Sequence, residues 1–232
     1  MAPGAEPAAA SAAAPSPGAA ATPPPLATSG ATSPTAPAPT AADYTLEPGK
    51  STLYVQVFKS PDTLASGASH DHVVAATGWS GTVRWDPSAP SACKVDIRVP
   101  VSGLRPDEDA MRKRVGYEVM LSASQREKIG EQMRAASQLD AARFGDITFA
   151  ATRCEAVGEQ VKVSGSLTVH GVAKTVTSTM KIRGDGQSFS ASGTFTAKAT
   201  DFGFEPYSAL LGALKNENEM KFTLDVRGAR RP

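Results

Sequence analysis

The stretch that decides the fold is QVKVSGSLTVHGVAKTVTSTMKIR, residues 160–183. Its first half alternates polar residues with Val161, Val163, Gly165, Leu167 and Val169. Its second half places Val176, Met180 and Ile182 on one face and threonines and a lysine on the other. A period of two with one apolar face is typical of a half-buried β-strand. The His-Gly pair between the halves is a turn signal, so the stretch predicts an antiparallel hairpin.

Six further stretches show the same alternation, some of them more weakly. The two clear ones are residues 93–101 and 219–227, and the weaker ones are 51–58, 71–85, 147–157 and 188–200. Within residues 71–85, Gly78 and Gly81 indicate a bend or a bulge. Eight strands without a repeated motif predict an all-β domain, either a closed barrel or a sandwich.

The N-terminal residues 1–43 differ in kind from the rest. They are rich in Ala, Pro, Ser and Thr and contain no Lys or Arg. Such a segment buries too little apolar area to offset its ordering entropy, so we expect a disordered linker before one domain at residues 44–232. It lacks the basic start and apolar core of a signal peptide. Its composition is typical of tethers that hold an exported domain to a membrane or wall.

Charge and hydropathy exclude several classes of protein. The formal net charge is +1, with 24 basic and 23 acidic residues, so no basic surplus points to nucleic acid. No apolar run approaches the roughly 18 residues of a membrane-spanning helix. No Gly-x-Ser-x-Gly elbow and no phosphate-binding glycine loop is present, and the composition implies no cofactor.

Helical signals are confined to one insertion in the strand pattern. Pro106 is followed by acidic and then basic residues and by Gly116, which predicts a short helix. Ser122 and Gln125 form a capping-box pattern, and Ile129 and Met133 follow at helical spacing. We expect this second helix to lie against the barrel. A membrane-surface helix is the alternative, but its apolar stripe is narrow.

The two cysteines, Cys93 and Cys154, fit no zinc or redox spacing. Cys93 opens one predicted strand and Cys154 closes the next, across the helical insertion. If those strands pair antiparallel, the thiols come close enough for a disulfide, which would indicate an oxidising compartment. Two unlinked thiols are the alternative.

Strands and turns in this order resemble the YceI-like family of lipocalin-like proteins. The strongest motifs are Leu-Thr-Val-His-Gly-Val-x-Lys at residues 167–174 and Arg-Phe-x-x-Ile-Thr-Phe at residues 143–149, and the resemblance covers residues 44–230. It implies an eight-stranded antiparallel barrel with a long apolar lumen that holds a polyisoprenoid, such as an isoprenoid quinone tail. It also implies a bacterial, exported, periplasmic or envelope-tethered protein. The chain departs from the family where it has Lys50 before Ser51, and in SHDHVV at residues 69–74.

The inward faces of such a barrel supply the candidate residues for binding an amphiphilic lipid. They are Leu53, Val55, Val57, Val95, Ile97, Val99, Phe149, Val163, Leu167, Val169, Val176, Met180, Phe189, Phe195, Met220, Phe222 and Leu224. Small inward residues such as Gly165 and Gly193 favour a lumen with room for a ligand over a lumen filled by side chains.

The segment 202–214 carries large apolar residues outside any clear strand. We expect it to plug the barrel end or gate its mouth, so four of its residues join the ligand-binding candidates: Phe202, Phe204, Leu210 and Leu211.

The histidines suggest the main alternative to a lipid-binding barrel, which is a metal-dependent enzyme. His70 and His72 lie on one face of a predicted strand, and His170 is the only further histidine. Three imidazoles and a water would make a zinc-type hydrolytic site. Nothing in the sequence places His170 near the other two, so we expect no catalytic residue and no metal. A ligand-free structural or interaction domain is the third hypothesis.

Overall fold

The computed structural model describes residues 41–64 and 69–232. The predicted disordered segment therefore lies outside the described residues, apart from its last three. Two of those, Ala42 and Asp43, belong to the first strand, where Ala42 is buried opposite Trp85. The first strand thus begins two residues before the boundary predicted at residue 44.

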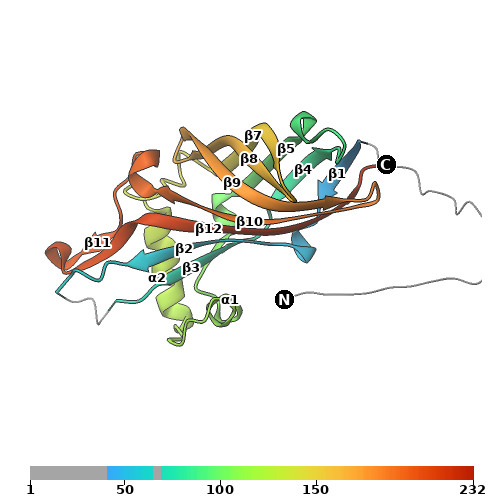
Figure 1. Cartoon of the computed structure of the whole chain (residues 1–232). Coiled ribbons are helices and arrows are strands. Elements are labelled where there is room, and N and C mark those ends of the chain that lie inside the picture. The colour runs from blue at the N-terminus through green and yellow to red at the C-terminus, as the bar shows by residue number, and fades with distance from the viewer. Residues whose placement is uncertain (1–40, 65–68) are drawn as a thin grey trace, which may run out of the picture. The chain divides into compact units, whose positions relative to one another are not determined.

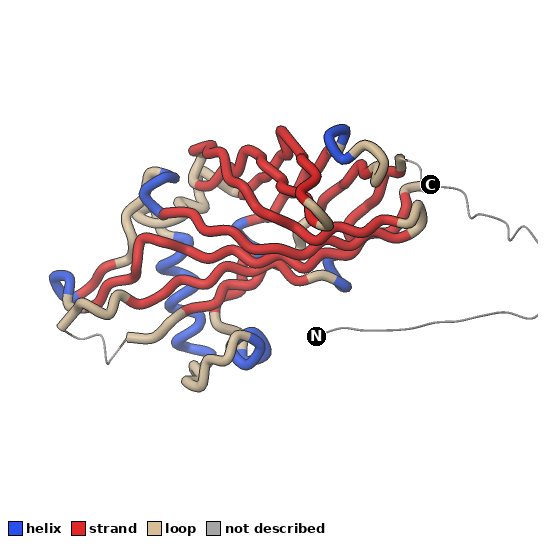
Figure 2. Tube along the Cα trace, in the orientation of Figure 1, coloured by secondary structure: helices blue, strands red, loops and turns tan. Residues whose placement is uncertain are grey.

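Within the described residues, twelve strands form one continuous antiparallel system, whose arrangement can be followed in Figures 1 and 2. They are β1 (Ala42–Leu46), β2 (Thr52–Lys59), β3 (His72–Ala76), β4 (Ser80–Trp85), β5 (Lys94–Pro100), β6 (Leu104–Pro106), β7 (Asp146–Val157), β8 (Gln160–Val169), β9 (Val172–Gly184), β10 (Ser188–Lys198), β11 (Ser208–Ala209) and β12 (Leu214–Arg230). Short 3-10 turns lie at Pro48–Lys50, Pro90–Ala92, Val101–Gly103, Ala199–Phe202 and Leu210–Gly212.

The sheet closes into an eight-stranded barrel because three of the long strands are broken. β1 and β2 both pair with β12, so they act as two halves of one strand. β3 and β4 are likewise halves of one strand, with the break at Gly78, whose φ of 64° lies in the left-handed region. β5 and β6 are halves of another, and β1 closes the ring by pairing with both β4 and β12. The predicted barrel is confirmed, and the sandwich alternative is excluded.

The predicted hairpin is β8 and β9, with Val169 opposite Val172. His170 and Gly171 form its turn, both with positive φ. Every second residue of β8 from Val161 to Val169 is buried, as its alternation requires.

Two helices lie in the insertion between β6 and β7. Helix α2 (Ala123–Arg134) begins with the expected capping box: Gln125 N donates to Ser122 Oγ, and Ser122 N donates to Gln125 Oε1. Helix α1 (Asp109–Arg114) begins later than predicted, because Pro106 belongs to β6 and Asp107 has a positive φ. In Figures 1 and 2, α2 crosses the barrel behind β2 and β3.

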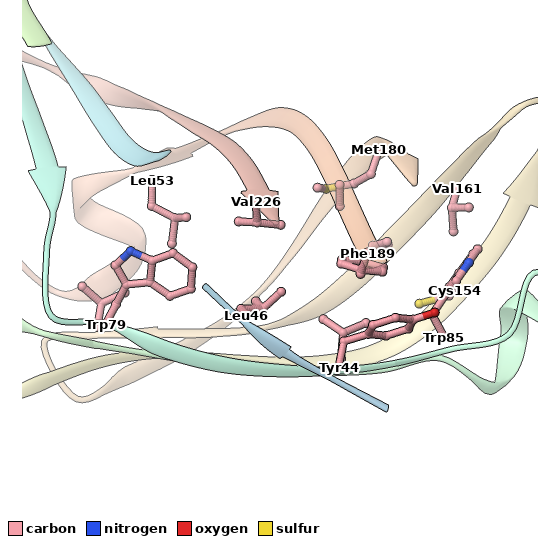
Figure 3. Close-up of a cluster of buried hydrophobic side chains, with 14 of the residues drawn as sticks. Tyr44, Leu46, Leu53, Trp79, Trp85, Cys154, Val161, Met180, Phe189 and Val226 are labelled. Carbon is pink, nitrogen blue, oxygen red and sulfur yellow. The ribbon is translucent and has the colours of Figure 1, made fainter. Parts of the chain in front are cut away.

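Figure 3 shows a cluster of buried hydrophobic side chains in which Tyr44, Trp85 and Phe189 lie close together. Tyr44, Trp85 and Phe189 are buried there, and the Tyr44 and Phe189 ring centroids are 5.3 Å apart. Gly186 N donates to the Tyr44 hydroxyl, which ties the β9–β10 turn to this cluster. A disulfide joins Cys93 to Cys154, with 6.1 Å between their Cα atoms, so it links the start of β5 to its neighbour β7.

Candidate ligand cavity

The barrel encloses a cavity of about 490 Å³. Every strand of the ring contributes to its wall, and most of the contributing side chains are aliphatic or aromatic. Cavities of this size with apolar walls and a few polar groups are typical of small-molecule sites.

The structure places nearly all the predicted ligand-binding residues in this wall. Those that line it are Leu53, Val55, Val57, Val95, Ile97, Val99, Phe149, Val163, Leu167, Val169, Val176, Met180, Phe189, Phe195, Phe204, Met220, Phe222 and Leu224. The strand alternation located them because the inner face of a barrel is one face of each strand.

Three predicted residues do not line the cavity. Phe202 is fully buried in a side cluster with Leu167, Val169 and Met220. Leu210 is 70% exposed and Leu211 is fully exposed. Neither leucine is in the core, and neither seals the cavity, so the expectation of a leucine gate is not supported by their positions.

The helical insertion contributes residues that the sequence analysis did not assign to the site. Lys128, Ile129, Gln132 and Met133 of α2 line the cavity, and Leu139 follows them. The available signal was the Ile129–Met133 stripe, which predicted contact with the barrel but not with the lumen. Val74, Val83, Ile147, Ile182 and Val226 also line the cavity, and each lies in a strand that the alternation predicted. Leu46 lines it too, but it belongs to β1, a strand that was not predicted.

The charged and amide side chains of the lining gather at the end opposite the aromatic cluster. They are Lys128, Gln132, Gln138, Asn216 and Glu217, from α2, the segment after it and the start of β12. Lys128 and Gln132 are exposed to solvent as well as lining the cavity. The cavity therefore has a closed end at Tyr44 and Phe189 and a polar mouth at α2.

Glycines in the wall do not all provide free space. A Cβ at Gly165 would lie 2.4 Å from the Phe149 ring, so that ring already occupies the room. A Cβ at Gly193 would lie about 3.0 Å from Ser178 and 3.1 Å from Met180. Inward glycines here accommodate neighbouring side chains, and the free volume arises from the barrel as a whole.

A buried charged cluster lies on the wall beside the mouth. Asp107 is fully buried and accepts hydrogen bonds from His72 Nδ1 on Oδ2 and from Arg112 on Oδ1, each at 2.6 Å. Val73 N also donates to Oδ1, at 3.1 Å. Arg112, only 1% exposed, additionally donates to the carbonyl oxygens of Asp71 and Val119. Burial alone would raise the pKa of Asp107, but the contacts with His72, Val73 and Arg112 hold that pKa below its usual value.

His70 packs against this cluster with its ring edge-to-face to that of His72, and the two ring centroids are 4.7 Å apart. Burial lowers the pKa of His70, and the neighbouring His72 lowers it further. Its Nε2 is buried, without a hydrogen-bond partner among the described residues. His70 therefore has one ring nitrogen without a partner among the described residues, and it lies next to His72, which lines the cavity.

The structure does not bring the three histidines together as a metal site. His170 lies at the β8–β9 turn, where its ring contacts Phe144 and Phe204 with centroids at 4.9 and 5.8 Å. Its conformation is left-handed, with a φ of 51°. The group that comes together instead is His70, His72 and Asp107, whose possible ligand atoms lie within 4.8 Å of one another.

A family model, the YceI-like domain, matches residues 44–227, which is most of the chain. The chain belongs to the YceI-like family. This family has a lipocalin-type barrel that generally binds hydrophobic ligands; it is not known as enzymatic, and its members are typically periplasmic.

Solved structures of similar fold agree with this assignment. One is Burkholderia cenocepacia BcnA, at 16% identity and a TM-score of 0.59, covering 78% of this chain and 98% of that one. Another is a Campylobacter jejuni YceI protein, at 18% identity and a TM-score of 0.52, covering 68% and 84%. A variant of the latter was crystallised with a monobromobimane guest. Among curated proteins, none matches the chain. No helix in residues 41–64 and 69–232 is long and apolar enough to cross a membrane.

Proposed function

We propose that this YceI-like protein binds an amphiphilic lipid without catalysing a reaction, and that the lipid is a polyisoprenoid or an isoprenoid quinone. The observation that carries the proposal is the cavity itself, which is lined mainly by aliphatic and aromatic side chains, is bounded at one end by the Tyr44 cluster and has its charged and amide side chains at the mouth. An amphiphile has the same distribution, with an apolar tail and one polar end.

The length of the cavity favours a chain-like ligand. Along β12 its wall runs from Asn216 to Val226, which is roughly 34 Å of strand at about 3.4 Å per residue. The stacked rings of Phe195 and Phe222, 4.7 Å apart, lie on neighbouring strands in that wall. Branched aliphatic and aromatic walls complement an unsaturated, methyl-branched tail by dispersion contacts.

The mouth would hold the polar end of the lipid. Amides at Gln132, Gln138 and Asn216 can hydrogen-bond carbonyl or hydroxyl oxygens. His72 lines the same cavity. These are neutral donors and acceptors for the most part, which suits a quinone or alcohol better than a highly charged group.

An exported location is consistent with the disulfide. Disulfides persist in oxidising compartments such as the bacterial periplasm and are rare in the cytosol. Together with the typically periplasmic location of family members, the disulfide supports a periplasmic or envelope-tethered carrier.

The metal-enzyme hypothesis has one supporting feature, the His70, His72 and Asp107 group. Against it, both Asp107 oxygens already accept protein donors, and the Arg112 cation touches one of them. A divalent cation there would have to displace a buried ion pair and sit beside a positive charge. The lipid-carrier function is therefore the better supported one.

A tryptophan in the lumen should displace the lipid. Leu224 lines the cavity at the centre of β12, opposite Leu53 on β2 and Gly193 on β10. We expect Leu224→Trp to fold but to carry severalfold less lipid, because the indole occupies the tail path. The molar ratio of extracted lipid to protein measures this.

The matched control is Lys221→Trp, on the same strand but exposed on the outer face. It should keep the lipid content of the unmodified protein. A Leu224→Trp protein with a normal melting transition and full lipid occupancy would show that the tail does not run past Leu224.

A further inference from the structure

Two exposed leucines stand at the tip of a hairpin. β11 and the start of β12 pair through Ser208 with Lys215 and Ala209 with Leu214. The tip between them is Leu210–Gly212, with Leu211 fully exposed and Leu210 at 70%. Exposing these apolar side chains to water is unfavourable in free energy, yet no described residue covers them.

The backbone at this tip holds the leucines outward. Leu210, Leu211 and Gly212 have φ values of 50°, 56° and 90°. Consecutive left-handed residues are normally Gly, Asn or Asp, because a larger side chain crowds the following carbonyl. If this tip served only as a turn, we would expect Gly, Asn or Asp at these positions. Strained backbone and exposed apolar side chains at the same two positions indicate a contact outside the chain.

The tip adjoins the cavity mouth. Pro206 and Tyr207, directly before β11, line the cavity, and Asn216, directly after Lys215, donates its N–H to the Tyr207 carbonyl. Figure 1 shows β11 projecting past the ends of the neighbouring strands.

A third exposed leucine lies on the adjacent loop. Leu64 is fully exposed and follows Thr63, whose hydroxyl donates to the Ser60 carbonyl. Ser60 N in turn donates to the Lys215 carbonyl, which joins this loop to the base of the β11–β12 hairpin.

We propose that Leu210 and Leu211, together with Leu64 on the adjoining loop, dock this end of the barrel on a lipid bilayer and so place the cavity mouth at the membrane surface. The choice of a bilayer rests on the proposed function, because a lipid that enters the cavity must leave a membrane. It also rests on shape. A protruding tip of few leucines can insert between lipid headgroups, whereas a stable protein interface needs about 800 Å² on each partner.

Vesicle binding tests the proposal directly. The full chain is mixed with phosphatidylcholine vesicles and with vesicles that also contain phosphatidylglycerol, and the bound fraction is measured by flotation. We expect measurable binding to both, and a partition coefficient reduced about tenfold or more in Leu210→Ser, Leu211→Ser. The matched control is Val157→Ser, since Val157 is 53% exposed at the β7–β8 turn near the disulfide end. It should leave vesicle binding unchanged.

Lipid content separates this proposal from the carrier function. The double variant should keep the unmodified protein's amount of co-purified lipid and its melting temperature, because neither leucine contacts the cavity or the core. Its transfer of a fluorescent isoprenoid quinone between vesicles should slow. If the unmodified protein does not bind either vesicle, or if the double variant binds as well as Val157→Ser does, the docking proposal is wrong. If the variant instead changes only self-association in sedimentation, the tip is a contact between copies of the chain.

Discussion

Reduction of the disulfide between Cys93 and Cys154 should lower the free energy of unfolding by about 4 kcal/mol. The two residues are 61 positions apart, and the chain-entropy model gives a loop of that size about this value. For a domain of this length the change corresponds to a fall in melting temperature of roughly 8–16 °C. Urea unfolding of protein refolded with and without reductant measures the difference.

The double variant Cys93→Ser, Cys154→Ala is the control. Cys154 is buried and Cys93 is half-buried, so these replacements suit each environment. This variant should be as unstable as the reduced protein and insensitive to reductant. Two free thiols in denatured, unreduced protein, or identical unfolding midpoints in the two conditions, would refute the link.

Asp107→Asn should destabilise the barrel by about 3–5 kcal/mol, because it leaves Arg112 as a buried cation without a counter-ion. Both side chains are almost fully buried, with 0% and 2% of their areas exposed. Asp146→Asn is the matched control: Asp146 also lies 2.6 Å from an arginine, Arg98, but that pair is exposed to solvent. We expect a far smaller loss of stability there.

Lowering the pH should also reveal how much the Asp107 carboxylate contributes to the free energy of unfolding. The pKa of folded Asp107 lies below its usual value, so the stabilisation from its carboxylate is complete above about pH 4, the unfolded value. It is lost as the pH falls through the lower, folded pKa. The unmodified protein should therefore lose stability relative to Asp107→Asn in strong acid. If Asp107→Asn and Asp146→Asn cost the same at pH 7, the buried pair is not what organises this wall.

Alternation along the strands was sufficient to predict an all-β domain and the inward faces of its strands, whereas the choice of a barrel over a sandwich came from the resemblance to the YceI-like family. In residues 160–183 the inward positions could be read directly, since the side-chain period of a strand is two. The cysteines could be paired for the same reason, because adjacent antiparallel strands bring the start of one near the end of the other.

Hydrophobicity outside the strands was not sufficient. Phe202 and Leu211 are both large apolar residues in one connection, yet the first is fully buried and the second fully exposed. The difference arises from backbone turns: the 3-10 turn Ala199–Phe202 folds inward, whereas the left-handed Leu210 and Leu211 point away. No period in the sequence encodes either turn.

The charged cluster was equally hidden from the sequence. Asp107 and Arg112 are five residues apart, which is not a helical pair, and His72 lies 35 positions before Asp107. Only the pairing of β3 with β6 brings them together. The sequence drew attention to His70 and His72 but offered His170 as their partner, which the β8–β9 turn places against Phe144 and Phe204.

The most direct test of the lipid-carrier account is organic-solvent extraction of the purified full-length protein, followed by mass spectrometry of the extract and metal analysis of the same sample. The account predicts an isoprenoid lipid at a substantial fraction of one molecule per chain and no stoichiometric metal. Protein that carries no lipid and takes up no isoprenoid quinone when offered it, or that carries one zinc ion per chain instead, would contradict it.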